Sequence, residues 1–230
     1  MNQNWKTAFR SFYYAAAPAP ADIVLPPTRT ALLIIDIQNT YLESPSDPAE
    51  AARWQPFLDR MHATVIPNTQ SLLESCRRRG VPVMFARIAT QTRNGCERSL
   101  SHCKPGFNDL LLPGDDGPSQ IVEELAPRSD EIVIEKITDS ALTGSNLRLM
   151  MSNMGIRHVI CAGIFTDQCV SSTVRSLADE SFDVVVVEDA CAAATDALHC
   201  HELEVINMIY CQVAWRSDVE GFLDAGTPRE

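Results

Sequence analysis

A cysteine stands where the sequence predicts the start of a helix, directly after a buried strand. Residues 159–162 form an apolar run typical of a parallel strand, and Gly163 ends it. Thr166 and Asp167 are residue types that cap helices, and a helical pattern follows from about Cys169. The positive end of a helix favours the thiolate, which is the nucleophilic form of cysteine. The position therefore predicts a nucleophile, although an isolated cysteine is more commonly a buried, unreactive core residue.

Two further strand ends carry groups that could act together with this cysteine. The apolar run 31–35 stops at Asp36, and the short β-rich run 131–135 stops at Lys136. The carboxyl ends of parallel strands share one rim of an open sheet, and such sheets bind their ligands at that rim. A carboxylate, an ammonium and a thiol on one rim would supply a base, a charged partner and a nucleophile.

Predicted strands and helices alternate along the chain, which favours a parallel sheet covered by helices on both faces. We therefore expect a single α/β domain over residues 29–225, with a three-layer α/β/α architecture and a mostly parallel, Rossmann-like sheet of about six strands. The strands are expected at about 30–36, 81–88, 131–136, 159–162, 183–187 and 211–215, and the helices at about 57–79, 118–125, 143–154, 169–178 and 194–208.

Three segments fall outside this alternation. Residues 1–28, in which alanine and proline alternate, predict an extended arm. Such arms often lie on a neighbouring subunit, so a homodimer or homotetramer is expected. Residues 43–56 are rich in proline, serine and aspartate and predict a loop over the rim. Residues 89–118 contain repeated helix and strand breakers, and a loop of this length is typical of a lid or binding loop.

The composition indicates an ordinary enzyme rather than a nucleic-acid-binding or membrane protein. The 230 residues, 45% of them hydrophobic, are enough for one domain with a full core. A net charge of −11 argues against a nucleic-acid partner. No apolar run reaches the roughly 18 residues of a membrane span, and the first residues lack a signal-peptide core. The eight cysteines show no C-x-x-C pairing, so we expect reduced thiols and a cytoplasmic location.

Taken together, these segments resemble the isochorismatase-like cysteine hydrolase family. The first matching motif is an apolar strand that ends in D-x-Q, here Asp36-Ile37-Gln38. The second is a lysine after the middle strand, here Lys136. The third is G-x-x-T-x-x-C-V-x-x-T-x-R, which runs from Gly163 to Arg175. The resemblance spans about residues 29–215, and the cysteine segment is its most specific part.

This resemblance implies a catalytic triad of Asp36, Lys136 and Cys169 and a three-layer α/β/α fold. It also implies a cis peptide near Ile164–Phe165. In that arrangement the backbone N–H groups of Phe165 and Cys169 form an oxyanion hole for a substrate carbonyl. No cofactor is needed for such a reaction.

The expected substrate is a small molecule rich in carbonyl groups. The segment that contains Gln212 is similar to the stretch that holds a substrate-binding glutamine in biuret hydrolases, although a polar strand terminus is the alternative. The hydrogen-bond donors expected near the rim favour a ureide or amide such as biuret, triuret or ureidoacrylate, which would be cleaved with release of ammonia. A vinyl-ether hydrolase of the isochorismatase type and a non-catalytic binding or scaffold protein are the alternatives. The candidate donors near the rim are Asn39, Tyr41, Arg87, Lys104 and Gln212.

Metal binding is not expected. The run His199-Cys200-His201 lies in a predicted helix, where adjacent side chains point about 100° apart and do not converge on one ion. The metal-dependent nicotinamidase branch of the family carries Asp-x-His and further histidines after the second strand. The corresponding segment here, residues 85–91, contains no histidine. The sequence therefore argues against both zinc and nicotinamide.

Treatment with EDTA or a stronger zinc chelator is expected to leave the rate of turnover unchanged, because the sequence offers no histidine cluster after the second strand. The measurement is ammonia release before and after chelation, together with the zinc content of the purified protein. Stoichiometric zinc that is lost together with activity would contradict this expectation.

Overall fold

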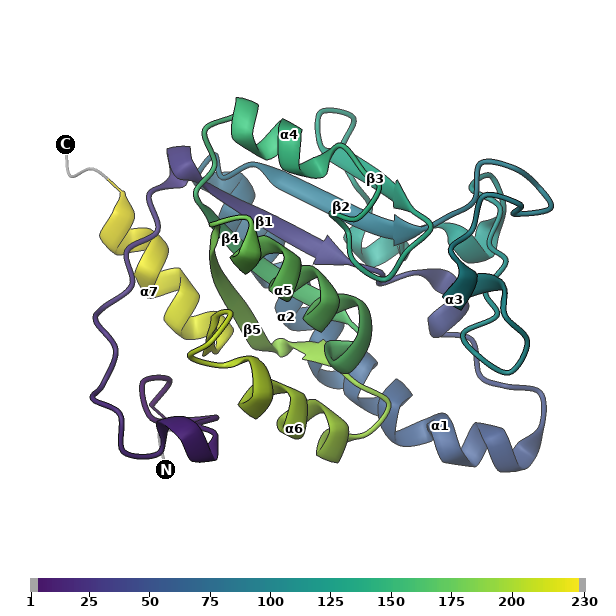
Figure 1. Cartoon of the computed structure of the whole chain (residues 1–230), viewed down its shortest axis with the longest axis horizontal. Helices are drawn as coiled ribbons and strands as arrows, with labels where there is room; N and C mark the ends of the chain where they lie inside the picture. The colour runs from purple at the N-terminus through teal and green to yellow at the C-terminus, as the bar shows by residue number, and fades with distance from the viewer. Residues whose placement is uncertain (1–3, 228–230) are drawn as a thin grey trace.

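The computed structural model describes residues 4–227, which are built around a six-stranded sheet. The strand order is β3-β2-β1-β4-β5-β6, and every neighbouring pair runs parallel. The predicted α/β fold is confirmed, and the sheet is entirely rather than mostly parallel (Figure 1). Its strands are β1 (Thr30–Ile35), β2 (Val83–Ile88), β3 (Ile132–Lys136), β4 (His158–Ile164), β5 (Asp183–Ala192) and β6 (Gln212–Ala214).

Helices cover both faces of this sheet, as the buried side chains of each helix show. Buried residues of α1, α2 and α7 pack with one face of the strands, and those of α4, α5 and α6 pack with the other. In Figure 1 the second group lies in front of the sheet. The helices are α1 (Pro48–Arg60), α2 (Ile66–Arg78), α3 (Leu100–Cys103), α4 (Leu147–Asn153), α5 (Ser171–Asp179), α6 (Asp196–Ile206) and α7 (Arg216–Gly226).

Part of the loop expected at 43–56 is helix α1 instead. The Asp47 side chain accepts hydrogen bonds from the backbone N–H groups of Ala49 and Glu50, each at 3.0 Å, and Pro48 occupies the first helical position. An aspartate cap followed by proline is a favourable helix start. The proline and aspartate that suggested a loop are therefore the residues that begin this helix.

The strand order places a ligand-binding crevice next to β1. Strands β2 and β3 lie on one side of β1, and strands β4, β5 and β6 lie on the other side. In open α/β sheets ligands bind where the order reverses, outside the carboxyl ends of the strands. Asp36 follows β1 and Cys169 follows β4, so the two residues lie on either side of this switch point.

The N-terminal arm contacts the body of its own chain in this structure (Figure 1). Trp5 is buried and its ring centroid is 5.2 Å from that of Phe222 in α7. The Asn207 side chain donates to the carbonyl oxygen of Phe9 at 3.0 Å. Residues 1–3 of the predicted arm lie outside the described residues, and the homo-oligomer stays a prediction.

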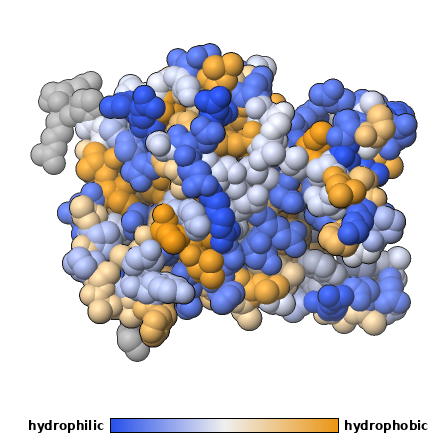
Figure 2. Space-filling view, viewed as in Figure 1, coloured by the Kyte–Doolittle hydropathy of each residue, from blue (hydrophilic) through white to orange (hydrophobic). Residues whose placement is uncertain are grey.

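The surface in Figure 2 shows apolar side chains as scattered patches among polar ones. The most exposed large apolar side chains belong to the arm, where Phe12 is 93% and Tyr13 is 85% exposed. Within residues 4–227, no helix combines the length and the apolar character needed to cross a membrane.

Gly163 allows β1 and β4 to approach each other at the switch point. Its φ is +129°, and a Cβ atom there would collide with the backbone carbonyl of Ile35. The pairing register between β4 and β5 also shifts between Cys161 and Gly163. A side chain at this position would therefore push apart the two strands that carry Asp36 and Cys169.

The substitution Gly163→Ala is expected to lower the free energy of unfolding by about 3 kcal/mol, because it combines a left-handed backbone with a clash against main-chain atoms. Gly155→Ala is the matched control, since Gly155 also has a positive φ of 72° but open space around it. Urea unfolding of both variants measures the difference. Equal losses of stability would contradict the close-approach argument.

Candidate active site

The structure brings Asp36, Lys136 and Cys169 together at the carboxyl rim of the sheet. Asp36 follows β1 with a left-handed φ of +54°, and its N–H donates to the carbonyl of Ala86 at 2.9 Å. Lys136 ends β3 and reaches past β2, the strand between β3 and β1. Cys169 lies in a single π-helical turn, Thr166–Val170, that leads into α5. All three residues are buried.

The ammonium of Lys136 links the three parts of the site. Its Nζ lies 2.7 Å from Oδ2 of Asp36 and 3.4 Å from Sγ of Cys169. It also donates to the carbonyl oxygen of Thr138 at 3.1 Å. The ammonium thus forms an ion pair with a carboxylate and donates to a thiol and to a backbone carbonyl. This contact set positions the carboxylate and the thiol relative to one another.

Burial and the neighbouring charges shift the pKa of each of the three groups. Burial raises the pKa of the Cys169 thiol well above its usual value, and the charge of Asp36 raises it further against the opposing effect of Lys136. Burial also raises the pKa of Asp36, which Lys136 counteracts. For Lys136, burial lowers the pKa, but Asp36 and Cys169 outweigh it and the net direction is upward.

In the resting site Lys136 contacts Asp36, and both burial and the Asp36 charge raise the pKa of the Cys169 thiol. The direction is opposite to the one that the helix-start position predicts for the thiol pKa. The reason is that a thiolate would lie buried next to a carboxylate, and desolvation and like charge both disfavour it. In such a site the thiol loses its proton to the neighbouring base as it attacks.

An aromatic cavity of about 370 Å³ opens beside the turn that carries Cys169. The ring centroids of Tyr41 and Phe165 are 5.4 Å apart, and those of Phe57 and Phe165 are 5.1 Å apart. Trp54 completes the aromatic wall. The cis peptide expected from the family resemblance is present between Ile164 and Phe165. Of the predicted substrate-binding residues, Tyr41 is the one that lines this cavity.

A more polar cleft of about 630 Å³ adjoins this cavity and contains Asp139. The two spaces share Asn108 and Gln168 among their lining residues. None of these three polar residues was identified from the sequence. Asn108 lies in the irregular segment 89–118, which has no periodicity to indicate where a side chain points. Asp139 and Gln168 lie within three residues of Lys136 and Cys169, and that proximity was the available signal.

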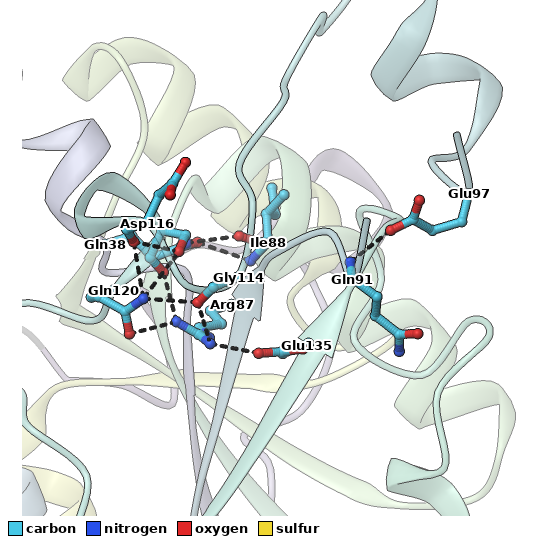
Figure 3. A network of polar contacts seen from close by, with 10 residues as sticks. Gln38, Arg87, Ile88, Gln91, Glu97, Gly114, Asp116, Gln120 and Glu135 are labelled. Atoms are coloured by element: carbon cyan, nitrogen blue, oxygen red, sulfur yellow. Dashed lines mark hydrogen bonds and ion pairs between the residues drawn. The ribbon is translucent and has the colours of Figure 1, made fainter. Parts of the chain in front are cut away.

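Asn39, which the sequence predicted to bind the substrate, and Gln38 both anchor the loop after β2. The Asn39 side chain donates to the carbonyl oxygen of Gly117 at 2.9 Å. Nε2 of the buried Gln38 donates to the carbonyl oxygens of Ile88 at 2.9 Å and Ser119 at 2.8 Å, and its Oε1 accepts from the Ile88 N–H (Figure 3). The glutamine of the D-x-Q motif is thus a structural clamp between β2 and the following loop.

Arg87 is held in a separate polar network, shown in Figure 3, and the structure does not bring it to the triad. Its guanidinium pairs with Glu135 and donates to Oε1 of Gln120 at 2.7 Å. Along β2, side chains alternate between the two faces of the sheet. Ile88 packs in the same cluster as Cys169, so Arg87 points to the opposite face. Arg87 was predicted to bind the substrate beside the triad, but it lies on the opposite face of the sheet.

Gln212 and Lys104 are also not placed at the site. Gln212 pairs with Val185 near the start of β5, whereas the carboxyl rim lies at Ala192. On the neighbouring strand β4, Val185 pairs with Ile160 and Ala192 pairs with Ile164. Gln212 therefore lies four residues of β4, about 13 Å, from the carboxyl rim and nearer the opposite one. Lys104 is exposed, with Nζ 4.2 Å from the ring centroid of Phe107. The prediction for Gln212 required β6 to end at the carboxyl rim, but β6 pairs with residues 185–187 of β5 instead.

His199 supports the turn that carries the nucleophile. Its ring is buried, with Nδ1 2.8 Å from Oγ1 of Thr166 and Nε2 3.3 Å from Oε1 of Glu188. Nη2 of Arg60 also lies 2.9 Å from Nε2. In the part of the chain that the structure describes, no three histidine, cysteine, aspartate or glutamate side chains converge as a metal site would require.

Comparison with known proteins identifies the family. An isochorismatase domain matches residues 30–217, and the chain belongs to this family. It is similar to an isochorismatase family protein from Burkholderia thailandensis, at 26% identity over 89% of this chain and 100% of that one, with a TM-score of 0.72.

Two further structures share the fold at lower identity. One is described as a cysteine hydrolase from Pseudomonas syringae pv. phaseolicola 1448A, with 21% identity, a TM-score of 0.75, and coverage of 91% of this chain and 100% of that one. The other is N-carbamoylsarcosine amidase from Thermoplasma acidophilum, with 22% identity, a TM-score of 0.64, and coverage of 82% and 96%. The family predicted from sequence is confirmed, and the biuret or ureide branch stays a prediction.

The substitution Lys136→Ala is expected to slow turnover by about a hundredfold or more, because the Cys169 thiol loses the neighbouring positive charge that opposes the rise of its pKa. Lys136→Arg is not expected to restore activity, since a planar guanidinium has a different size and geometry from an ammonium. The pH dependence of Cys169 alkylation by iodoacetamide measures the thiol directly. Lys104→Ala is the control, and a fully active Lys136→Arg enzyme would show that charge alone is sufficient.

Proposed function

We propose that this protein hydrolyses a C–N bond of a small amide or ureide by covalent catalysis through Cys169. The observation that carries this proposal is the contact of one buried ammonium with both a carboxylate and a thiol, at 2.7 Å and 3.4 Å. A nucleophile, a base within reach and a charged group that orients both are the parts that acyl transfer requires. The fold shared with an N-carbamoylsarcosine amidase supports C–N hydrolysis as the reaction.

The mechanism follows from the positions of these groups. Asp36 takes the thiol proton as Sγ of Cys169 attacks the substrate carbonyl carbon, and Lys136 stabilises the charges. Backbone N–H groups of Phe165 and Cys169 hold the resulting oxyanion. The C–N bond then breaks as Asp36 returns its proton to the leaving nitrogen. Water attacks the acyl or carbamoyl thioester, the C–S bond breaks, and the thiol is restored.

A ureide such as biuret, triuret or ureidoacrylate is the substrate class that we propose. The aromatic wall formed by Tyr41, Trp54 and Phe165 suits a planar group, which can stack against a ring. Asn108 and Gln168 bring amide donors and acceptors to the junction of the cavity and the cleft. Vinyl-ether hydrolysis needs no nucleophile, so that reaction would not use the contact between Lys136 and Cys169.

The substitutions Cys169→Ser and Cys169→Ala are expected to lower ammonia release by at least about a thousandfold, because no covalent intermediate can form. Ammonia release is measured over a panel of biuret, triuret, ureidoacrylate and nicotinamide, with no turnover of nicotinamide expected. Mass spectrometry of rapidly quenched wild-type enzyme should show the acyl adduct on Cys169.

Cys200→Ser is the matched control, because Cys200 is an exposed cysteine outside the site. Circular dichroism should show that the variants keep the fold. Activity above a few per cent in Cys169→Ala, or turnover of isochorismate alone by the wild type, would contradict the proposed function.

A further inference from the structure

A second carboxylate, Asp139, lies beside the nucleophile on the side that faces the cleft. Its Oδ1 is 3.8 Å from Sγ of Cys169. Its side chain is 38% exposed, whereas the side chain of Asp36 is 2% exposed. The thiol therefore has a buried carboxylate on the inner side and a solvent-facing carboxylate on the outer side. The mechanism described above uses the inner one and leaves the outer one without a role.

Asp139 is held in place by a buried histidine from the long segment after β2. His102 lies in α3, and its Nε2 is 3.1 Å from Oδ1 of Asp139. The backbone around His102 is itself anchored. Nη1 of Arg98 donates to the His102 carbonyl oxygen at 2.8 Å, and the Ser99 N–H donates to the carbonyl oxygen of Ile137 at 3.1 Å. This gives Asp139 a defined orientation toward the thiol.

The two carboxylates differ in charge state. The hydrogen bond from His102 lowers the pKa of Asp139, whereas burial raises the pKa of Asp36. At neutral pH, Asp139 is therefore an anion, and its charge adds to those that raise the pKa of Cys169. Because its pKa is lowered, Asp139 is a weaker base than Asp36 and is not the group that takes the thiol proton. Its contribution must come when the substrate is present.

The position of Asp139 indicates which part of the substrate it contacts. An anion repels the oxyanion, so the carbonyl oxygen must turn toward the backbone N–H groups and away from Asp139. The nitrogen on the same carbon can then face the carboxylate and donate hydrogen bonds to it. When that nitrogen receives a proton it becomes cationic, and the attraction to Asp139 increases. An interaction that strengthens along the reaction accelerates it.

We propose that Asp139, oriented by His102, binds the N–H groups of the leaving nitrogen and stabilises the positive charge that this nitrogen gains before the C–N bond breaks. This inference rests on the proposed function and specifies its substrate class. The site should favour substrates whose leaving nitrogen carries free N–H groups, such as the terminal –NH₂ of a ureide. In the balanced step Sγ bonds to carbon, Asp36 gives up its proton, and ammonia leaves beside Asp139.

The first test measures the charge beside Cys169 without a substrate. Wild type and Asp139→Asn are alkylated with iodoacetate, iodoacetamide and 2-bromoethylamine, which are anionic, neutral and cationic, and Cys169 modification is followed by peptide mass mapping. Relative to iodoacetamide, Asp139→Asn should react about threefold or more faster with iodoacetate and slower with 2-bromoethylamine. Asp115→Asn, which removes an exposed carboxylate paired with Arg93, should keep the wild-type selectivity.

The second test measures turnover of the panel ureide that the wild type cleaves best. Asp139→Asn should lower kcat/KM about ten- to a hundredfold, mainly through kcat, because the charge on nitrogen develops during the reaction. His102→Gln, which keeps an N–H donor, should retain more activity than His102→Ala. Circular dichroism identifies a His102 variant that fails to fold. In that case the kcat/KM of Asp139→Asn alone decides the test.

The outcomes separate this inference from the proposed function. No ammonia release by the wild type from any panel member refutes the proposed function. A wild type that is active, with Asp139→Asn equal to it in kcat/KM, overturns only the role of Asp139. Wild-type alkylation selectivity in Asp139→Asn overturns it as well, because the carboxylate would then not face the reacting sulfur.

Discussion

The ammonium of Lys136 lies in a region that water barely reaches, and the geometry of the site depends on how its charge is compensated. A buried cation is costly unless it has charged and hydrogen-bonding partners. Here Asp36, Cys169 and the Thr138 carbonyl supply those partners. The same contacts that offset the cost of burying Lys136 also hold Asp36 and Cys169 at 2.7 Å and 3.4 Å from its ammonium. Stability and catalytic geometry therefore come from one set of interactions.

The parallel sheet makes this arrangement possible because three strand ends converge on one rim. Asp36 and Cys169 flank the point where the strand order reverses, and Gly163 lets their strands approach closely there. On the α6 side of the turn that carries Cys169, the side chain of Thr166 lies within hydrogen-bonding distance of the buried His199, and this contact supports the turn. The reacting sulfur is thus carried by a turn that is held through Thr166 and through the contact of Cys169 with Lys136. Such support limits the movement of a group that must meet a substrate carbon in one orientation.

The two carboxylates beside Cys169 illustrate how environment separates the roles of identical groups. Asp36 is buried against an ammonium and its pKa is raised, which suits a group that accepts and returns a proton. Asp139 borders a cleft, is bonded to His102 and has a lowered pKa, which suits a group that stays charged. The inner carboxylate can move protons, and the outer one can attract a nitrogen. The long segment that carries His102 thereby contributes to the site without contacting the sulfur.

The sequence by itself determined the features that depend on local pattern. Apolar runs ending in Asp36 and Lys136, and a helix start at Cys169, predicted the α/β alternation and the rim that carries the candidate triad. Only the tertiary structure decided what depends on register, facing and burial. Gln212 lies near the far rim because β6 pairs with the start of β5, and Arg87 points to the other face of the sheet. The raised pKa of the Cys169 thiol and the His102–Asp139 contact also required the folded chain, because desolvation and contacts across 37 residues leave no periodic signal in a sequence.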